Sequence, residues 1–134
     1  MTGPTWRRVL LACLGFVGAC PALCLTAAEL DRVAARSNQS LPRMVAKDLR
    51  QDPIEVFGMT LVYNYKHLTL DSGQLRGMRL EETQRPYVLP SLCADPDSGR
   101  MLREGVRFRY VYRGRDSRVG GEFLLSQLNC SDRR

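Results

Sequence analysis

Hydrophobic and polar residues alternate most regularly between Gly105 and Cys130. The apolar set is Val106, Phe108, Tyr110 and Tyr112, and the set between them is Arg107, Arg109, Val111 and Arg113. A period of two predicts a strand with one buried face. Residues Gly114 to Arg118 predict a turn and Val119 to Leu125 a return strand, so the stretch is interpreted as a β-hairpin.

A second alternating stretch, Met59 to Leu70, predicts another strand, and Asp71-Ser72-Gly73 closes it with turn residues. Tyr63 and Tyr65 share one face of this strand, as Tyr110 and Tyr112 share one face of the later strand. We interpret these tyrosines as cross-strand neighbours in one sheet rather than as a binding surface, because tyrosine favours strands and tolerates a wet edge. Gly120-Gly121 predicts a bulge in the return strand.

Three stretches have helical patterns. Glu29 to Asn38 carries one narrow apolar stripe, and Thr83 to Cys93 predicts a helix that Pro90 shortens or bends. Asp95 to Gly105 predicts a well-capped helix, with Asp95 at the N-cap, Pro96 in the first turn and Gly105 at the C-terminal end.

Two stretches leave alternatives open. Leu41 to Arg50 fits a short helix capped by Ser40, whereas Met44 to Asp52 also fits an extended segment that leads into the first strand. Gln74 to Glu82 fits a further edge strand, without excluding other structures. The pattern as a whole predicts an α+β fold, with short N-terminal helices and one capped helix on an antiparallel sheet of three to four strands.

Residues 1–28 are typical of a signal peptide, which leaves residues 29–134 as a single domain. Arg7 and Arg8 precede an uncharged run, and Thr26-Ala27-Ala28 offers small residues before a cut at Glu29. Two alternatives remain. Val17-Gly18-Ala19-Cys20 fits a lipobox with lipidation at Cys20, and the uncut run Val9 to Ala28 is long enough to anchor the chain in a membrane. All three place the folded part outside the cytoplasm.

Cysteine parity favours cleavage and predicts a disulfide. Three of the five cysteines, Cys13, Cys20 and Cys24, lie in the export segment. Removal of that segment leaves Cys93 and Cys130, an even pair in an oxidising compartment. Their bond would close a loop that contributes roughly 3–4 kcal/mol to stability.

Positive charge is concentrated in the second half of the chain. From Arg100 onward there are nine arginines and four acidic residues. The candidate binding residues are the arginines of the hairpin, namely Arg107, Arg109, Arg113, Arg115 and Arg118. Such a strand face suits an acidic protein surface or another anionic surface, although a solvated face is the plainer interpretation. Nucleic acid is an improbable partner for an exported protein.

The sequence offers no catalytic, metal-binding or cofactor-binding motif. His67 is the only histidine, so the chain has no histidine cluster for zinc, and no serine stands out as its nucleophilic partner. No glycine-rich phosphate loop is present. We therefore predict a protein that is not an enzyme and needs no cofactor.

The order of several short motifs resembles a group of small exported bacterial proteins of unassigned function. The matching residues are Leu41-Pro42 with Val45, Tyr63 and Tyr65, Leu92-Cys93 with Asp95-Pro96, Gly105-Val106 with Tyr110 and Tyr112, and Cys130. The resemblance spans most of the chain after residue 28 and implies an α+β domain with one disulfide.

These observations predict an exported, non-catalytic binding or accessory module, periplasmic or envelope-associated, that contacts a protein or an envelope component. The alternatives are a small secreted hydrolase and a membrane-tethered accessory subunit, facing the periplasm, that uses a basic strand face. The pattern leaves the oligomeric state open.

Overall fold

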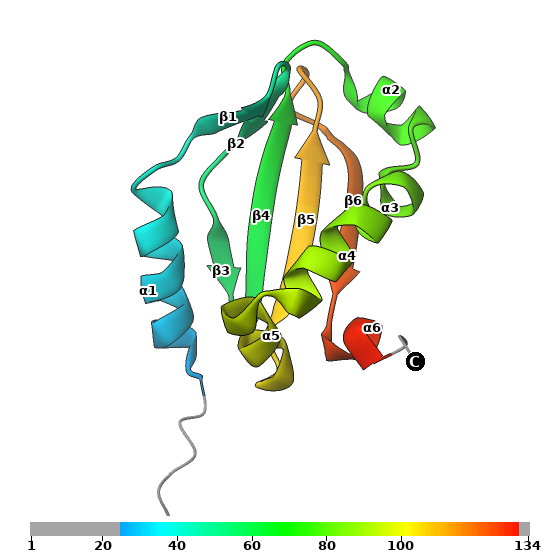
Figure 1. Cartoon of the computed structure of the whole chain (residues 1–134). Helices are drawn as coiled ribbons and strands as arrows, with labels where there is room; N and C mark the ends of the chain where they lie inside the picture. The colour runs from blue at the N-terminus through cyan, green and yellow to red at the C-terminus, as the bar shows by residue number, and fades with distance from the viewer. Residues whose placement is uncertain (1–24, 132–134) are drawn as a thin grey trace, which may run out of the picture.

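The computed structural model describes residues 25–131, which form one sheet with helices packed against it (Figure 1). The predicted signal peptide lies almost wholly outside these residues, and so do Cys20 and its lipobox. In chain order the elements are α1 (Ala27–Asn38), β1 (Arg43–Ala46), β2 (Leu49–Gln51), β3 (Glu55–Phe57), β4 (Thr60–His67), α2 (Ser72–Gly77), α3 (Leu80–Thr83), α4 (Arg85–Ala94), α5 (Pro96–Arg103), β5 (Arg107–Arg113), β6 (Val119–Leu125) and α6 (Gln127–Ser131). None of the described helices is long and apolar enough to cross a membrane.

The α+β prediction is confirmed, but the sheet is larger than predicted and is not purely antiparallel. Six strands form one sheet in the order β1-β2-β4-β5-β6, and β3 pairs with the first half of β4. The central strands β4 and β5 run parallel, with Tyr63 opposite Tyr110 and Tyr65 opposite Tyr112. Parallel pairing needs a long crossover connection, and helices α2 to α5 supply it between β4 and β5.

The two open stretches are now resolved. Residues 43–51 form the β1–β2 hairpin, so the extended alternative is the better one and the short helix is wrong. The predicted helix would have buried Val45, but Val45 is 44% exposed. The proposed edge strand between Gln74 and Glu82 is also wrong. A reciprocal capping box between Asp71 and Gln74 begins α2 there, and α3 follows it.

The predicted helices and the hairpin are confirmed. Helix α1 begins two residues before Glu29, because the Thr26 hydroxyl accepts the Glu29 amide while the Glu29 carboxylate accepts the Thr26 amide. Asp95 caps α5 by accepting a hydrogen bond from the Ser98 amide at 2.8 Å. Strands β5 and β6 pair antiparallel, with the predicted bulge at Gly120, where the register shifts.

One face of the sheet carries the whole core. The helices contribute buried residues such as Leu30, Leu75 and Leu92 to a single cluster that also contains Leu61 and Phe108 from the sheet. In Figure 1, α4 and α5 cross in front of this face. The other face presents Val62 and Val111, which are buried but lie outside the cluster. We call these two sides of the sheet the helix face and the open face.

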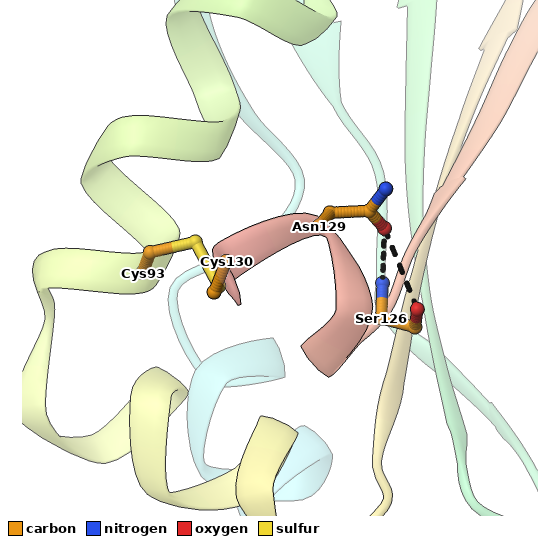
Figure 2. The surroundings of a disulfide bond; sticks show 4 residues. All are labelled: Cys93, Ser126, Asn129 and Cys130. Atoms are coloured by element: carbon orange, nitrogen blue, oxygen red, sulfur yellow. Dashed lines mark hydrogen bonds between the residues drawn. A yellow bond between two sulfur atoms is a disulfide. The ribbon is translucent and has the colours of Figure 1, made fainter. Parts of the chain in front are cut away.

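The predicted disulfide joins Cys93 of α4 to Cys130 of α6, with a Cα–Cα distance of 5.7 Å. Figure 2 shows the bond between the two helices. It also shows the Asn129 side chain directed at Ser126, the residue just before α6. The Asn129 side-chain oxygen accepts the Ser126 amide at 2.8 Å. The bond therefore fixes α6 against the C-terminal end of α4, rather than fixing the sheet to α5.

Candidate functional site

The five candidate arginines lie at two ends of the same strand. Arg107 and Arg109 occupy the start of β5, while Arg113 ends it and Arg115 and Arg118 lie in the following turn. Arg107 and Arg113 are six positions apart along the strand, or about 20 Å. The hairpin arginines therefore do not form one patch.

The arginines near the start of β5 surround a hollow on the open face. Arg109 forms an ion pair with Glu122 across the β5–β6 pair. The hollow is about 410 Å³ in volume and is lined by Phe57, Thr60, Val62, Arg107, Arg109, Glu122 and Leu124. Because Glu122 already compensates Arg109, Arg107 is left as the uncompensated cation among these lining residues.

The helix face carries a more organised feature, a floor of stacked aromatic rings. Tyr63 stacks on Tyr110 with ring centroids 5.2 Å apart, and Tyr65 stacks on Tyr112 at 5.0 Å. Phe123 of β6 continues the floor, 5.1 Å from Tyr110. The parallel register of β4 and β5 produces this arrangement, because it aligns the two Tyr-x-Tyr pairs ring to ring. The predicted cross-strand neighbours are thus confirmed.

The tyrosine hydroxyls remain free to bind. Within residues 25–131 none of Tyr63, Tyr65, Tyr110 and Tyr112 hydrogen-bonds through its hydroxyl, and none of these oxygens is among the buried atoms that lack a partner. Each hydroxyl therefore keeps some contact with solvent, although Tyr110 and Tyr112 as whole residues are only 6% and 7% exposed. Burial raises the pKa of Tyr63 to about 12 and raises the pKa values of the other three. All four are neutral donors at physiological pH.

Three hollows lie along this floor. The middle one, about 450 Å³, has Tyr65 and Tyr110 at its base and Tyr87, Val88, Ser91 and Leu92 of α4 as one wall. The second, about 330 Å³, adjoins Tyr112 and is lined by Leu49, Leu75, Met78 and Leu80. The third, about 210 Å³, adjoins Tyr63 and is lined by Leu41 and Ile54. The three hollows share no lining residue, but the tyrosines at their bases are in ring contact, and we refer to the three together as the tyrosine groove.

The groove combines an apolar base with a polar rim. Tyr87 stands on the α4 wall with 77% of its surface exposed. Asp95 lies at the end of that wall, and Arg43 and Lys47 line the opposite side. This combination suits a segment that presents apolar side chains downward and polar groups at its edges.

His67 has a local structural role. Its Nδ1 accepts the backbone amide of Leu70 at 3.0 Å and that of Thr69 at 3.3 Å, which shapes the turn after β4. No group of three or more potential metal ligands occurs among the described residues. The geometry around His67 therefore offers nothing in favour of the hydrolase alternative.

Sequence reasoning missed the groove, although a signal for it was present. The two Tyr-x-Tyr pairs were interpreted as packing alone, yet leucine or phenylalanine would pack equally well without a hydroxyl. What the sequence could not supply is how α1 and α4 pack on the sheet, which leaves hollows beside Tyr63 and Tyr65, while Tyr110 and Tyr112 are only 6% and 7% exposed.

Comparisons with known proteins place the fold but no family. No protein-family profile and no curated protein matches the chain. Among solved structures, a Pseudomonas aeruginosa protein described as secreted matches with a TM-score of 0.68 and 18% identity, covering 78% of this chain and 91% of its own.

Two pilotins of type II secretion systems match as well. EpsS from Vibrio vulnificus has a TM-score of 0.61 and 14% identity, with 76% of this chain and 88% of EpsS covered. AspS from Vibrio cholerae has a TM-score of 0.55 and 18% identity, with 74% of this chain and 86% of AspS covered. At these identities the similarity shows that the chain has the fold of these proteins.

Proposed function

We propose that the protein is a non-catalytic accessory protein of the bacterial envelope that holds a segment of a partner protein in the tyrosine groove. The observation that carries the proposal is the row of stacked tyrosines with free hydroxyls beneath an exposed Tyr87. Tyrosine is enriched in binding interfaces because one side chain combines apolar area with a hydrogen-bond donor.

The similar structures suggest which kind of partner the protein binds. Two of the three are described as pilotins of type II secretion systems, and the third is described as secreted. We therefore propose that the partner belongs to a secretion system and that the chain acts outside the cytoplasm. An export signal in residues 1–28 supports that location, whether it is cleaved, lipidated at Cys20 or left as an anchor.

Site-specific photo-crosslinking in intact cells tests the proposal. A photoreactive residue at Ser91 faces the groove from α4, whereas one at Ala35 lies on an exposed position of α1 away from it. We expect one discrete protein adduct from position 91 and none from position 35. Equal adducts from both positions, or no protein adduct at position 91, would contradict the proposal.

A binding measurement with the captured protein provides the second test. Tyr87→Ala removes an exposed aromatic wall residue without disturbing the core. We expect affinity to fall about tenfold, since an aromatic anchor at an interface commonly contributes more than 1 kcal/mol. Leu128→Ala, which removes an equally exposed side chain from α6, is the matched control and should leave affinity unchanged.

A further inference from the structure

The open face of the sheet carries a row of like charges in register. Arg50 of β2 lies opposite Lys66 of β4, and Lys66 lies opposite Arg113 of β5. Adjacent strands are about 4.8 Å apart, so the three cations are immediate neighbours. Like charges directly opposite each other destabilise a sheet. We call these three residues the basic row.

Local contacts compensate the row only in part. Asp52 binds the Arg50 guanidinium through two contacts, of 2.5 and 3.2 Å. Among residues 25–131, no carboxylate forms an ion pair with Lys66 or Arg113. Lys66 donates to the Ser117 hydroxyl at 2.8 Å, and Arg113 donates to the Ser117 carbonyl oxygen at 3.2 Å. These two neutral acceptors leave both positive charges uncompensated.

The adjoining turns add to the positive charge. Arg115 and Arg118 are exposed in the turn between β5 and β6. Asp116, which lies between them, is directed to α2, where it accepts the Ser72 hydroxyl at 2.7 Å. Lys47 and Asp48 in the β1–β2 turn offset each other. This end of the open face therefore has a net positive charge.

Exposed apolar residues flank the same end. Met44 of β1 lies opposite Arg50 and is 49% exposed, and Val45 beside it is 44% exposed. Leu68, just beyond the end of β4, is 41% exposed. Cations next to exposed aliphatic side chains are the combination that binds a lipid surface, where charges meet headgroups and apolar groups enter the interface.

We propose that the basic row, with Met44 and Leu68, is a docking surface for an anionic lipid bilayer. The positive charge fits phosphate headgroups, and the aliphatic side chains fit the boundary beneath them. This inference is independent of the tyrosine groove, because it rests on the opposite face of the sheet. It also differs from a site at Arg107 and Arg109, since Glu122 compensates Arg109.

Vesicle sedimentation of the mature full-length protein tests the proposal. The probes are vesicles of phosphatidylcholine alone and vesicles with about one-third phosphatidylglycerol, and the readout is the ratio of the two partition coefficients. An N-terminal tether would raise binding to both vesicle types by the same factor, so its contribution cancels in this ratio. We expect the ratio for Lys66→Gln/Arg113→Gln to be roughly 30-fold below wild type, since each cation near an anionic surface contributes about fivefold.

The matched control is Arg100→Gln/Arg103→Gln, which removes the same charge from exposed positions on α5. It should keep the wild-type ratio within about twofold. Raising salt from about 0.1 to 1 M shortens the screening length from about 10 to 3 Å and should abolish the preference. Met44→Ser/Leu68→Ser should lower binding at both salt concentrations.

Two outcomes would overturn the proposal: no wild-type preference for anionic vesicles, or an equal loss in the row variant and the α5 control. Either result would leave an acidic protein surface as the remaining use of the row. Thermal unfolding of the row variant serves as the folding check, and its midpoint should be at or above that of wild type because like charges no longer face each other.

Discussion

A glycine in β6 sets how closely α2 approaches the sheet. A Cβ at Gly120 would lie 2.5 Å from Leu75 Cβ and 3.0 Å from the Ser72 carbonyl oxygen. Gly120→Ala must therefore displace α2, and we expect it to lower the free energy of unfolding by about 1–3 kcal/mol. Urea denaturation measures the change.

Gly77→Ala is the control for this substitution. A Cβ at Gly77 meets nothing within 4 Å, and the residue lies in α2, where alanine is preferred by up to about 1 kcal/mol. We expect Gly77→Ala to be neutral or stabilising. If the two variants unfolded at the same urea concentration, the close-approach argument for Gly120 would be wrong.

The tyrosine floor makes stability depend on alkaline pH. Burial raises the pKa of Tyr63 from 10.0 in an exposed side chain to about 12. A raised pKa means that the neutral ring stabilises the fold fully below pH 10 and that this contribution is lost as pH rises toward 12. The loss should be on the order of 1–2 kcal/mol by pH 12.

Tyr63→Phe removes this titration. Urea midpoints measured from pH 8 upward should fall less steeply for Tyr63→Phe than for wild type. Tyr87→Phe, at a position 77% exposed, is the matched control for the substitution itself. Parallel curves for wild type and Tyr63→Phe would show that Tyr63 titrates as an exposed phenol and that the floor is wetter than its geometry indicates.

At the scale of elements, α4 is the helix that most depends on an external restraint. It has no side-chain cap at its N-terminus, and Leu92 is its only buried residue. Pro90 within it cannot donate a backbone hydrogen bond to the carbonyl one turn earlier. The Cys93–Cys130 bond attaches its C-terminal end to α6. The groove wall formed by α4 therefore relies on the disulfide.

Cys93→Ser should lower stability by roughly 3–4 kcal/mol, because the lost bond closes a loop between positions 37 residues apart. We expect amide exchange to accelerate first in α4 and α6, while α1, on the other side of the groove, keeps its protection. Comparison of reduced and oxidised wild-type protein gives an independent measure. Equal urea midpoints for the two forms would contradict this prediction.

The N-terminus of α1 bears on where the mature chain begins. The capping box joins Thr26 to Glu29, and Leu25 packs against the core. Cleavage after Ala28 would remove the cap, at about 1 kcal/mol, and would place a positive amino group at the positive end of the helix dipole. We therefore expect the mature chain to retain Leu25 to Ala28, as both the lipidated and the uncut alternatives do.

Intact mass of the protein purified from the envelope checks this expectation, and a mass that begins at Glu29 would contradict it. Thr26→Ala should destabilise the retained form by about 1 kcal/mol, whereas Ala28→Ser, an exposed change in the same turn, should have little effect.

The sequence predicted local features well because each depends on neighbours along the chain. The capped helix at Asp95, the bulge at Gly120 and the disulfide follow from short motifs with one physical cause each. The sequence predicted the direction of strand pairing poorly, since parallel and antiparallel strands can have the same alternating pattern. The groove was missed for another reason: the pattern predicts that the tyrosines are cross-strand neighbours, which the contact between Tyr65 and Tyr112 confirms, but it does not show where α1 and α4 pack on the sheet.

At the scale of the whole molecule, one sheet separates two surfaces of different chemistry. Alternation along β4 sends Tyr63 and Tyr65 to the helix face, and Lys66 to the open face. The tyrosine groove and the basic row thus share strands β4 and β5 but face opposite directions. A partner in the groove does not cover the row, and a bilayer on the row leaves the groove accessible.

This arrangement predicts that the two proposed activities are independent. Tyr87→Ala should weaken the groove adduct and keep the wild-type preference for anionic vesicles. Lys66→Gln/Arg113→Gln should lose that preference and keep the crosslink from position 91. The triple variant should show both losses with no further change, because residues without shared contacts act additively. Measuring the yield of the position-91 crosslink between the purified protein and the captured partner, with and without anionic vesicles, checks this directly. A yield that changes with vesicles would show that the sheet couples its two faces.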